Sequence, residues 1–196
     1  MRSTVRPVLA AGLVAAGFAL AGCDSSAANE AEGPASATST LTETGLQIAV
    51  PSGYDPCVDI PQSVLDSEDL VKGVADNKAD ATGPGGTEWR GCAWARAGGD
   101  GYAVSVQVTN VTIPFVREHY SIDRREFTVA GRPAISVRKN ETRSSEVCSI
   151  NIEMRGGSLE FHLDNPASNR DTGQMDTCQL GVTFAEKVVP TLPSNV

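Results

Sequence analysis

The residues best suited to chemistry in this sequence are its five cysteines, and one of them follows a short apolar segment near the N-terminus. That residue, Cys23, is preceded by Leu20-Ala21-Gly22, and small residues at this place are what a signal peptidase requires. A cysteine here is typical of a lipobox, in which the thiol is acylated and the chain is then cut before it. The pattern predicts that Cys23 becomes the acylated first residue of the mature chain.

The segment before Cys23 has the layout of an export signal. Arg2 and Arg6 supply positive charge, and an apolar run from Val8 to Leu20 follows. This run is 13 residues long, whereas a transmembrane helix needs roughly 20. An ordinary secretory signal needs no cysteine at this place. We therefore predict a lipoprotein signal peptide over residues 1–22 and a chain anchored through Cys23, by acyl groups such as palmitate, to the extracytoplasmic face of the cell membrane.

The other four cysteines form an even set in a chain that is predicted to be exported, where the oxidising compartment favours disulfides. Four cysteines allow three pairings. We favour Cys57–Cys92 with Cys148–Cys178, because each pair closes a loop of moderate length within one half of the chain. The alternative is a zinc site, but no two cysteines have CxxC spacing and neither histidine is near a cysteine in sequence. We therefore expect no metal.

The familiar sequence signatures of catalysis are missing. There is no GxSxG elbow, no HExxH, no Walker loop and no Rossmann fingerprint. His119 and His162 can titrate near neutrality, but the sequence shows no nucleophile or orienting acid beside either. His162 is expected to face solvent, because it alternates with Phe161 and Leu163 along a predicted strand. We predict no catalytic residues, no cofactor and no enzymatic activity.

The charge of the chain excludes some partners and suggests others. The sequence has 16 basic and 24 acidic residues, and removal of residues 1–22 takes away two of the arginines. A chain this acidic is a poor candidate for binding nucleic acid. Its positive charge is concentrated in mid-sequence, where it could form a patch for an acidic glycan, a lipid headgroup or a protein partner; the alternative is a solvated face. The candidate patch consists of Arg117, Arg124, Arg125, Arg138, Lys139 and Arg143.

Composition divides the mature chain into two parts. Residues 23–45 are rich in Ser, Ala, Thr, Glu and Gly and contain almost no large apolar residue. Such a segment cannot bury enough surface to offset the entropy of ordering it, so it is predicted to be a disordered tether. Residues 46–196 are long enough for one ordinary domain.

Alternation of apolar and polar residues marks the strands of this domain. A Gly-Gly turn between two of the alternating stretches predicts a hairpin. The predicted strands are residues 89–96, 102–108, 126–129, 134–137, 147–154 and 159–163.

Helices are predicted between and after these strands. A short one covers residues 114–120, and a longer one follows Asp176, which can cap it. In the longer helix Leu180, Phe184 and Val188 recur at four-residue spacing, as expected for a buried stripe. The sequence therefore predicts an α+β fold, a mostly antiparallel β-sheet with helices packed on one face and two disulfides.

Several short motifs, taken in their order and spacing, resemble a known group of proteins. The motifs are Tyr54-Asp55-Pro56-Cys57, Ile60-Pro61, Gly91-Cys92-Ala93-Trp94, Gly131-Arg132-Pro133-Ala134, Cys148, Cys178 and Leu192-Pro193. Together they resemble small envelope lipoproteins of actinobacteria, of the mycobacterial and nocardial type, that carry a domain of unknown function. The resemblance covers about residues 46–193. It implies a disulfide-bonded, lipid-anchored envelope protein and provides no catalytic residues.

These observations favour a non-enzymatic binding or accessory domain held at the membrane by Cys23. Its expected partner is an envelope lipid, a glycan or a membrane protein. One alternative is an envelope hydrolase or transferase whose site is assembled from distant residues. Another is an extracytoplasmic sensor module that acts beside a membrane kinase or transporter.

Overall fold

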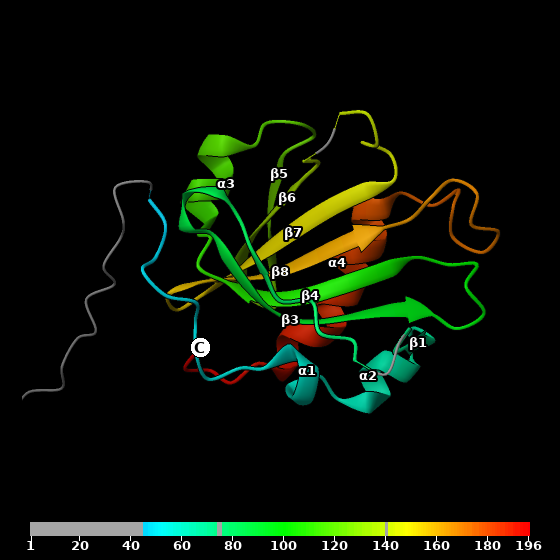
Figure 1. The fold of residues 1–196 in the computed structure, drawn as a ribbon, viewed down its shortest axis with the longest axis horizontal. Helices are drawn as coiled ribbons and strands as arrows, with labels where there is room; N and C mark the ends of the chain where they lie inside the picture. Colours follow the sequence, from blue (N-terminus) through cyan, green and yellow to red (C-terminus); the bar gives the residue numbers. More distant parts are fainter. Residues whose placement is uncertain (1–44, 74–75, 140) are drawn as a thin grey trace, which may run out of the picture. The chain divides into compact units, whose positions relative to one another are not determined.

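A computed structural model describes residues 45–73, 76–139 and 141–196, and these form an antiparallel sheet with helices packed against it (Figure 1). The strand order is β1-β3-β4-β8-β7-β6-β5, and β2 pairs with β3. The strands are β1 (Leu70–Val71), β2 (Ala81–Thr82), β3 (Glu88–Arg96), β4 (Ala103–Thr109), β5 (Arg125–Val129), β6 (Arg132–Val137), β7 (Val147–Met154) and β8 (Gly157–Asp164). The predicted α+β fold class, a mostly antiparallel sheet with two disulfides, is confirmed.

The central strands form where the apolar alternation predicted them. The β7 strand has the predicted bounds, and it pairs with β8 through the Arg155-Gly156-Gly157 turn. In the middle of the sheet, Phe161 of β8 lies opposite Val106 of β4 on one side and Ile150 of β7 on the other. All three side chains are fully buried. Alternation predicted these strands because one face of each packs into a core.

Two short strands were missed by the sequence analysis. Both β1 and β2 are two residues long and pair with β3, and β2 lies within a Gly- and Pro-rich segment where no strand was predicted. A two-residue strand has no periodicity to detect. It forms because β3, whose residues do alternate, offers it backbone partners.

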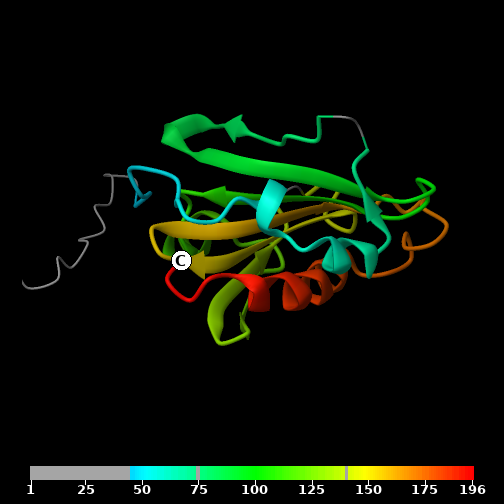
Figure 2. The same ribbon diagram turned by 90° about the horizontal axis from the view of Figure 1, so that it is seen from below.

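The helices lie on both faces of the sheet, not on one face as predicted, because β6 is apolar on both of its faces and the third helix covers the second one. They are α1 (Pro56–Asp59), α2 (Gln62–Asp66), α3 (Ile113–His119) and α4 (Thr177–Val188). The longest, α4, starts as predicted, because the Asp176 side chain accepts a hydrogen bond from the backbone N–H of Gln179. It contacts β7 and β8, and Figure 2 shows it along one side of the sheet, in red. Phe184 of α4 meets Phe161 of β8 edge-on, with ring centroids 5.8 Å apart.

The buried apolar residues form two clusters, one on each face. The larger contains the inward residues of β3, β4, β7 and β8 together with α4 and the segment around α1 and α2. The smaller joins Ile113 and Val116 of α3 to Ile135 and Val137 of β6. Because Ile135 and Val137 alternate with residues of the larger cluster, α3 covers the opposite face from α4. Polar residues, among them Ser149, Glu160 and His162, occupy the rest of that second face.

The two disulfides have the favoured pairing. Cys57 is bonded to Cys92 and Cys148 to Cys178, with 5.2 Å between the Cα atoms in each pair. The first bond ties α1 to β3, and the second ties β7 to the first turn of α4. Bonds that close loops of about this length typically stabilise a fold by roughly 3–4 kcal/mol.

The predicted signal peptide (residues 1–22), Cys23 and most of the predicted tether (residues 23–45) lie outside the described residues. Within the described residues, no helix has the length and apolar character needed to cross a membrane.

Candidate functional site

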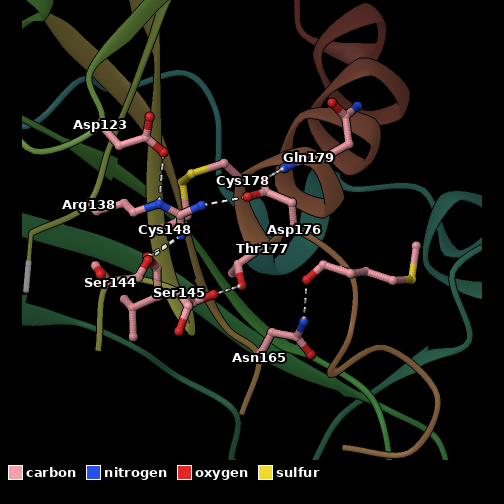
Figure 3. A network of polar contacts seen from close by, with 12 residues as sticks. Asp123, Arg138, Ser144, Ser145, Cys148, Asn165, Asp176, Thr177, Cys178 and Gln179 are labelled. Atoms are coloured by element: carbon pink, nitrogen blue, oxygen red, sulfur yellow. Dashed lines mark hydrogen bonds and ion pairs between the residues drawn. A yellow bond between two sulfur atoms is a disulfide. The ribbon is translucent and has the colours of Figure 1, made fainter. Parts of the chain in front are cut away.

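Arg138, one of the six basic residues of the predicted patch, is buried rather than displayed at the surface. Its guanidinium bridges two carboxylates, with Nε 3.0 Å from Asp123 and Nη2 2.6 Å from Asp176, the residue that caps α4 (Figure 3). It also donates to the carbonyl of Ser144, and the whole group lies beside the Cys148–Cys178 disulfide. The Arg138 side chain is 8% exposed. Arg138 therefore joins α4 to the ends of β6 and β7 and offers no open cation.

The other arginines of the predicted patch also have partners within the protein. Arg117 makes two hydrogen bonds of 2.8 Å to Glu126, and Arg125 pairs with Asp123 at 3.0 Å. Arg143 pairs with Glu146 and Asp164. Arg124 donates to the carbonyl oxygens of Arg117 and Tyr120. The six residues therefore do not form one open cationic surface, because most of their charges are matched by carboxylates.

Lys139 is the centre of a polar cluster on the second face of the sheet. Its ammonium lies 2.5 Å from Glu160, a β8 residue that is 2% exposed. The other oxygen of Glu160 accepts a 2.9 Å hydrogen bond from the indole N–H of Trp89. The ammonium also lies 5.3 Å from the centroid of the Tyr120 ring, a distance typical of a cation–π contact. We call Trp89, Lys139, Ser149, Glu160 and His162 the Glu160 cluster.

The Glu160 carboxylate is ionised despite its burial. Burial alone would raise its pKa, but the charge and hydrogen bond of Lys139, with the Trp89 indole, lower that pKa to about 2. Sequence reasoning missed this pair, because 21 residues separate the two side chains along the chain. The alternation of Glu160 with Phe161 was the only available signal, and it suggested a solvent-facing position.

His162 lies on the face opposite Phe161 and Leu163, as the alternation predicts, but solvent reaches it only in part. Its ring is partly buried, and its Nδ1 lies 2.9 Å from the hydroxyl of Ser149 on the neighbouring strand. Burial lowers the pKa of His162, which favours the neutral ring. A Ser–His contact invites comparison with nucleophilic catalysis, but Ser149 is only 1% exposed, so a substrate cannot reach its hydroxyl. The other histidine, His119, is exposed and stacks on Phe115.

The described residues contain no group of three or more His, Cys, Asp or Glu side chains that could hold a metal ion. The acidic loop before β2 uses its carboxylates locally. Asp80 accepts a hydrogen bond from the backbone N–H of Gly91, and Asp76 accepts one from that of Lys78.

A cavity of about 640 Å³ lies at one end of the sheet. Its walls come from the first described residues, the start of α3, the β5–β6 turn and the β7–β8 turn. Gly131 and Gly156 form these two turns with positive φ angles of 82° and 84°, a conformation that glycine adopts without strain. The lining includes Gln47, Ile113, Phe115, Arg132, Met154 and Arg155. Its volume is within the range of small-molecule sites.

The charged groups of this cavity differ from those of the predicted patch. Arg132 is held by main-chain oxygens, donating from Nη1 to Val196 at 2.6 Å and from Nη2 to Pro193 at 3.1 Å. Arg155 is exposed on its turn. Neither takes part in the ion pairs found in the described parts of the chain. Gly131-Arg132-Pro133 is recognisable in the sequence only as part of a family motif, because nothing in the sequence shows that the two turns, the start of α3 and the segment around Gln47 meet.

Residues 18–191 of the chain match the family DUF3558, described as a protein of unknown function. The chain belongs to this family. No curated protein and no solved structure matched it. The expectation of an uncharacterised domain is therefore confirmed, and it fits residues that include both disulfides, the Glu160 cluster and most of the cavity lining.

In this DUF3558 chain, the two polar regions are suited to different tasks. The Glu160 cluster is closed, since Lys139 and Trp89 both bond to Glu160 and Ser149 bonds to His162. The cavity is open and combines apolar walls with arginine donors, which is the usual composition of a ligand site. We take the cavity as the candidate functional site.

Proposed function

We propose that this protein is a lipid-anchored lipoprotein of the cell envelope whose DUF3558 domain binds a ligand without catalysing a reaction. The lipobox ending at Cys23 supports the anchor. The family match begins at residue 18, so it takes in Cys23 as well as the folded domain. The two disulfides agree with an oxidising compartment. The resemblance of its motifs to actinobacterial envelope lipoproteins supports the same proposal.

The observation that carries the binding role is the position of the cavity. Gly45 and Gln47, among the first described residues, line it. Cys23 and Gly45 are 22 positions apart in the chain, so they can be separated by at most about 75 Å. Acylation of Cys23 would therefore hold the cavity within that distance of the bilayer, where envelope lipids, glycans and membrane proteins are concentrated.

The chemistry of the polar residues favours binding over catalysis. The Ser149 hydroxyl is buried against His162, and the Glu160 carboxylate is bonded to Lys139 and Trp89. These groups stabilise one another and lie away from the cavity lining. The cavity lining itself supplies hydrogen-bond donors and apolar contacts, which orient a ligand.

The anchor is tested by labelling cells with an alkyne analogue of palmitate. We expect the protein to carry the label at Cys23, the Cys23→Ser variant to lose it and the Cys57→Ser variant to keep it. Unchanged labelling of Cys23→Ser would contradict the anchor.

The binding role is tested by native mass spectrometry of the chain purified from its own envelope. We expect a reproducible bound mass that is lost in Gln47→Trp, which places a large ring in the cavity while its backbone bonds to Asn110 remain. The matched control is Ile48→Trp, because Ile48 is its exposed neighbour outside the lining. The same bound mass in both variants would contradict the cavity as the site.

A further inference from the structure

The chemistry of the cavity lining indicates what kind of ligand it binds. We propose that the cavity binds an amphiphile with an anionic head, a phosphate ester or a carboxylate, which Arg132 and Arg155 hold while its apolar part lies on Ile113, Phe115 and Met154. This inference rests on the proposed binding function and adds the class of ligand.

Arg132 is positioned as an anion receptor. Its Nη1 donates to the main-chain oxygens of Glu153 and Val196, and its Nη2 donates to that of Pro193. These bonds fix the orientation of the guanidinium plane. Its Nε has no hydrogen-bond partner among the residues that the structure describes, and one N–H of Nη2 is also left. Two parallel N–H groups on one edge of a guanidinium match two oxygens of a phosphate or carboxylate.

Arg155 adds a second positive charge to the same cavity. It is exposed on the β7–β8 turn, and its side chain has no partner within the described ranges. Other basic side chains of the domain show that carboxylates are available where a cation needs one: Arg117, Arg138 and Lys139 are all paired. Neither cavity arginine has a hydrogen bond or ion pair to an Asp or Glu side chain in the described residues. The charge of Arg155 therefore remains available to a bound anion, whereas Arg132 also bonds to an oxygen of Val196, the last residue of the sequence, and offers the anion its remaining N–H groups.

The apolar part of the lining lies directly beside these arginines. Ile113 and Met154 are each 4% exposed, and Phe115 is half-buried at the start of α3. Met154 precedes Arg155 in the chain, so apolar and cationic groups come from one turn. Of these three side chains Phe115 is the most exposed, and a ligand that contacts it together with the arginines needs a charged head and an apolar portion.

Two carboxylates on the lining allow a test of whether the ligand is an anion or a cation. Glu118 and Glu153 line the cavity and are exposed, and neither has a side-chain partner in the described residues. Each repels an anion, so removing either charge is expected to tighten the binding of an anionic ligand. The same substitutions would weaken a cationic ligand.

The experiment is isothermal titration of the full chain carrying Cys23→Ser with three probes. These are n-octyl phosphate, n-octyl glucoside with the same chain but no charge, and inorganic phosphate. We expect saturable binding of octyl phosphate at least roughly tenfold tighter than that of either other probe, because an arginine–phosphate bond is charge-assisted. Equal affinity for octyl glucoside would overturn the anionic head, and equal affinity for inorganic phosphate would overturn the amphiphile in favour of a free anion.

Variants separate the cavity from non-specific attraction. Arg155→Ala should weaken octyl phosphate binding by roughly tenfold, and Glu118→Gln should strengthen it by about twofold. The matched control, Lys72→Ala, removes an exposed cation outside the cavity and should leave the affinity unchanged. Equal losses in Arg155→Ala and Lys72→Ala would overturn the site. Arg155 is preferred to Arg132, because Arg132 also holds the chain near Val196.

Failure of this inference is distinguishable from failure of the proposed function. If octyl phosphate does not bind, the inference is wrong. The binding function then still stands if native mass spectrometry shows a ligand that is lost in Gln47→Trp and kept in Ile48→Trp.

Discussion

The Glu160 cluster and the cavity around Arg132 use charge in opposite ways. In the cluster, a buried carboxylate is matched by the ammonium of Lys139, which is itself only partly exposed. In the cavity, Arg132 is oriented by main-chain oxygens, including one of Val196, the last residue of the sequence, and Arg155 extends from a turn. Neither is paired with an Asp or Glu side chain among the described residues. A charged side chain that is paired with an opposite charge inside the protein stabilises the folded conformation. A charged side chain that has no Asp or Glu partner can instead bind a ligand of opposite charge.

The predicted basic patch and the cavity consist of different residues, since none of the six patch residues lines the cavity. Sequence can show that basic residues are frequent, but it cannot show which of them have partners. Arg117, Arg138 and Arg143 are paired with carboxylates in the structure, whereas the arginines of the cavity, Arg132 and Arg155, do not belong to the predicted patch. The patch was predicted from the number of basic residues, whereas the structure shows which of these residues are paired with carboxylates.

The largest effect is expected from removing the cation of the Glu160 cluster. Lys139→Met leaves a buried carboxylate without its counterion, and breaking a buried ion pair in this way costs about 3–5 kcal/mol of the free energy of unfolding. Urea denaturation measures this loss. The double variant Lys139→Met/Glu160→Met should recover most of it, because it removes both charges. A Lys139→Met variant as stable as Lys72→Met would contradict a structural role for the cluster.

A smaller effect is expected at Arg138, although it makes more bonds. Its partners Asp123 and Asp176 are 33% and 52% exposed at their side chains, so water can solvate them when the guanidinium is removed. Arg138→Met should therefore destabilise the domain by about 1–2 kcal/mol, less than Lys139→Met. The same urea titration compares the two. A larger loss of unfolding free energy in Arg138→Met than in Lys139→Met would show that the exposure of the carboxylate left behind does not determine the loss.

As the pH is lowered, the free energy of unfolding should fall in two stages. His162 has a lowered pKa in the fold, so the unfolded chain takes up its proton first, and stability should begin to fall as the pH drops below about 6.5. Glu160 also has a lowered pKa, so its contribution is present above about pH 4.5 and is lost as the pH falls towards 2. Thermal unfolding from pH 8 to pH 3 measures both stages. His162→Gln should remove the first stage, and retention of that stage in the variant would exclude His162 as its cause.

The smallest effect on stability is expected in the cavity. Arg155→Ala removes an exposed side chain without a partner, so the free energy of unfolding should change by less than about 0.5 kcal/mol. Ligand binding, in contrast, should weaken. Thermal unfolding without ligand checks the first expectation. A loss of several kcal/mol would show that the charge at Arg155 is needed by the fold, and the contrast with Lys139 would fail.

Sequence reasoning predicted the parts of the fold that repeat a local pattern. The long strands and α4 were predicted because their buried faces impose alternation or four-residue spacing, as at Leu180 and Phe184. The disulfide pairing followed from loop length. The Glu160–Lys139 pair and the burial of His162 were not predictable, because they depend on which strands are neighbours. The cavity was not predictable either, since it forms where two turns meet the start of α3 and the segment around Gln47.

The contrast between matched and available charge is tested most directly by NMR of the isotopically labelled Cys23→Ser chain during titration with n-octyl phosphate. The side-chain Nε–H signals of arginine and the indole N–H signals of tryptophan report on both regions in one spectrum. We expect the Arg132 and Arg155 signals to shift with saturation, while the Trp89 indole, bonded to Glu160, does not move. Shifts of the Trp89 and Arg138 signals with Arg132 and Arg155 unchanged would contradict the account.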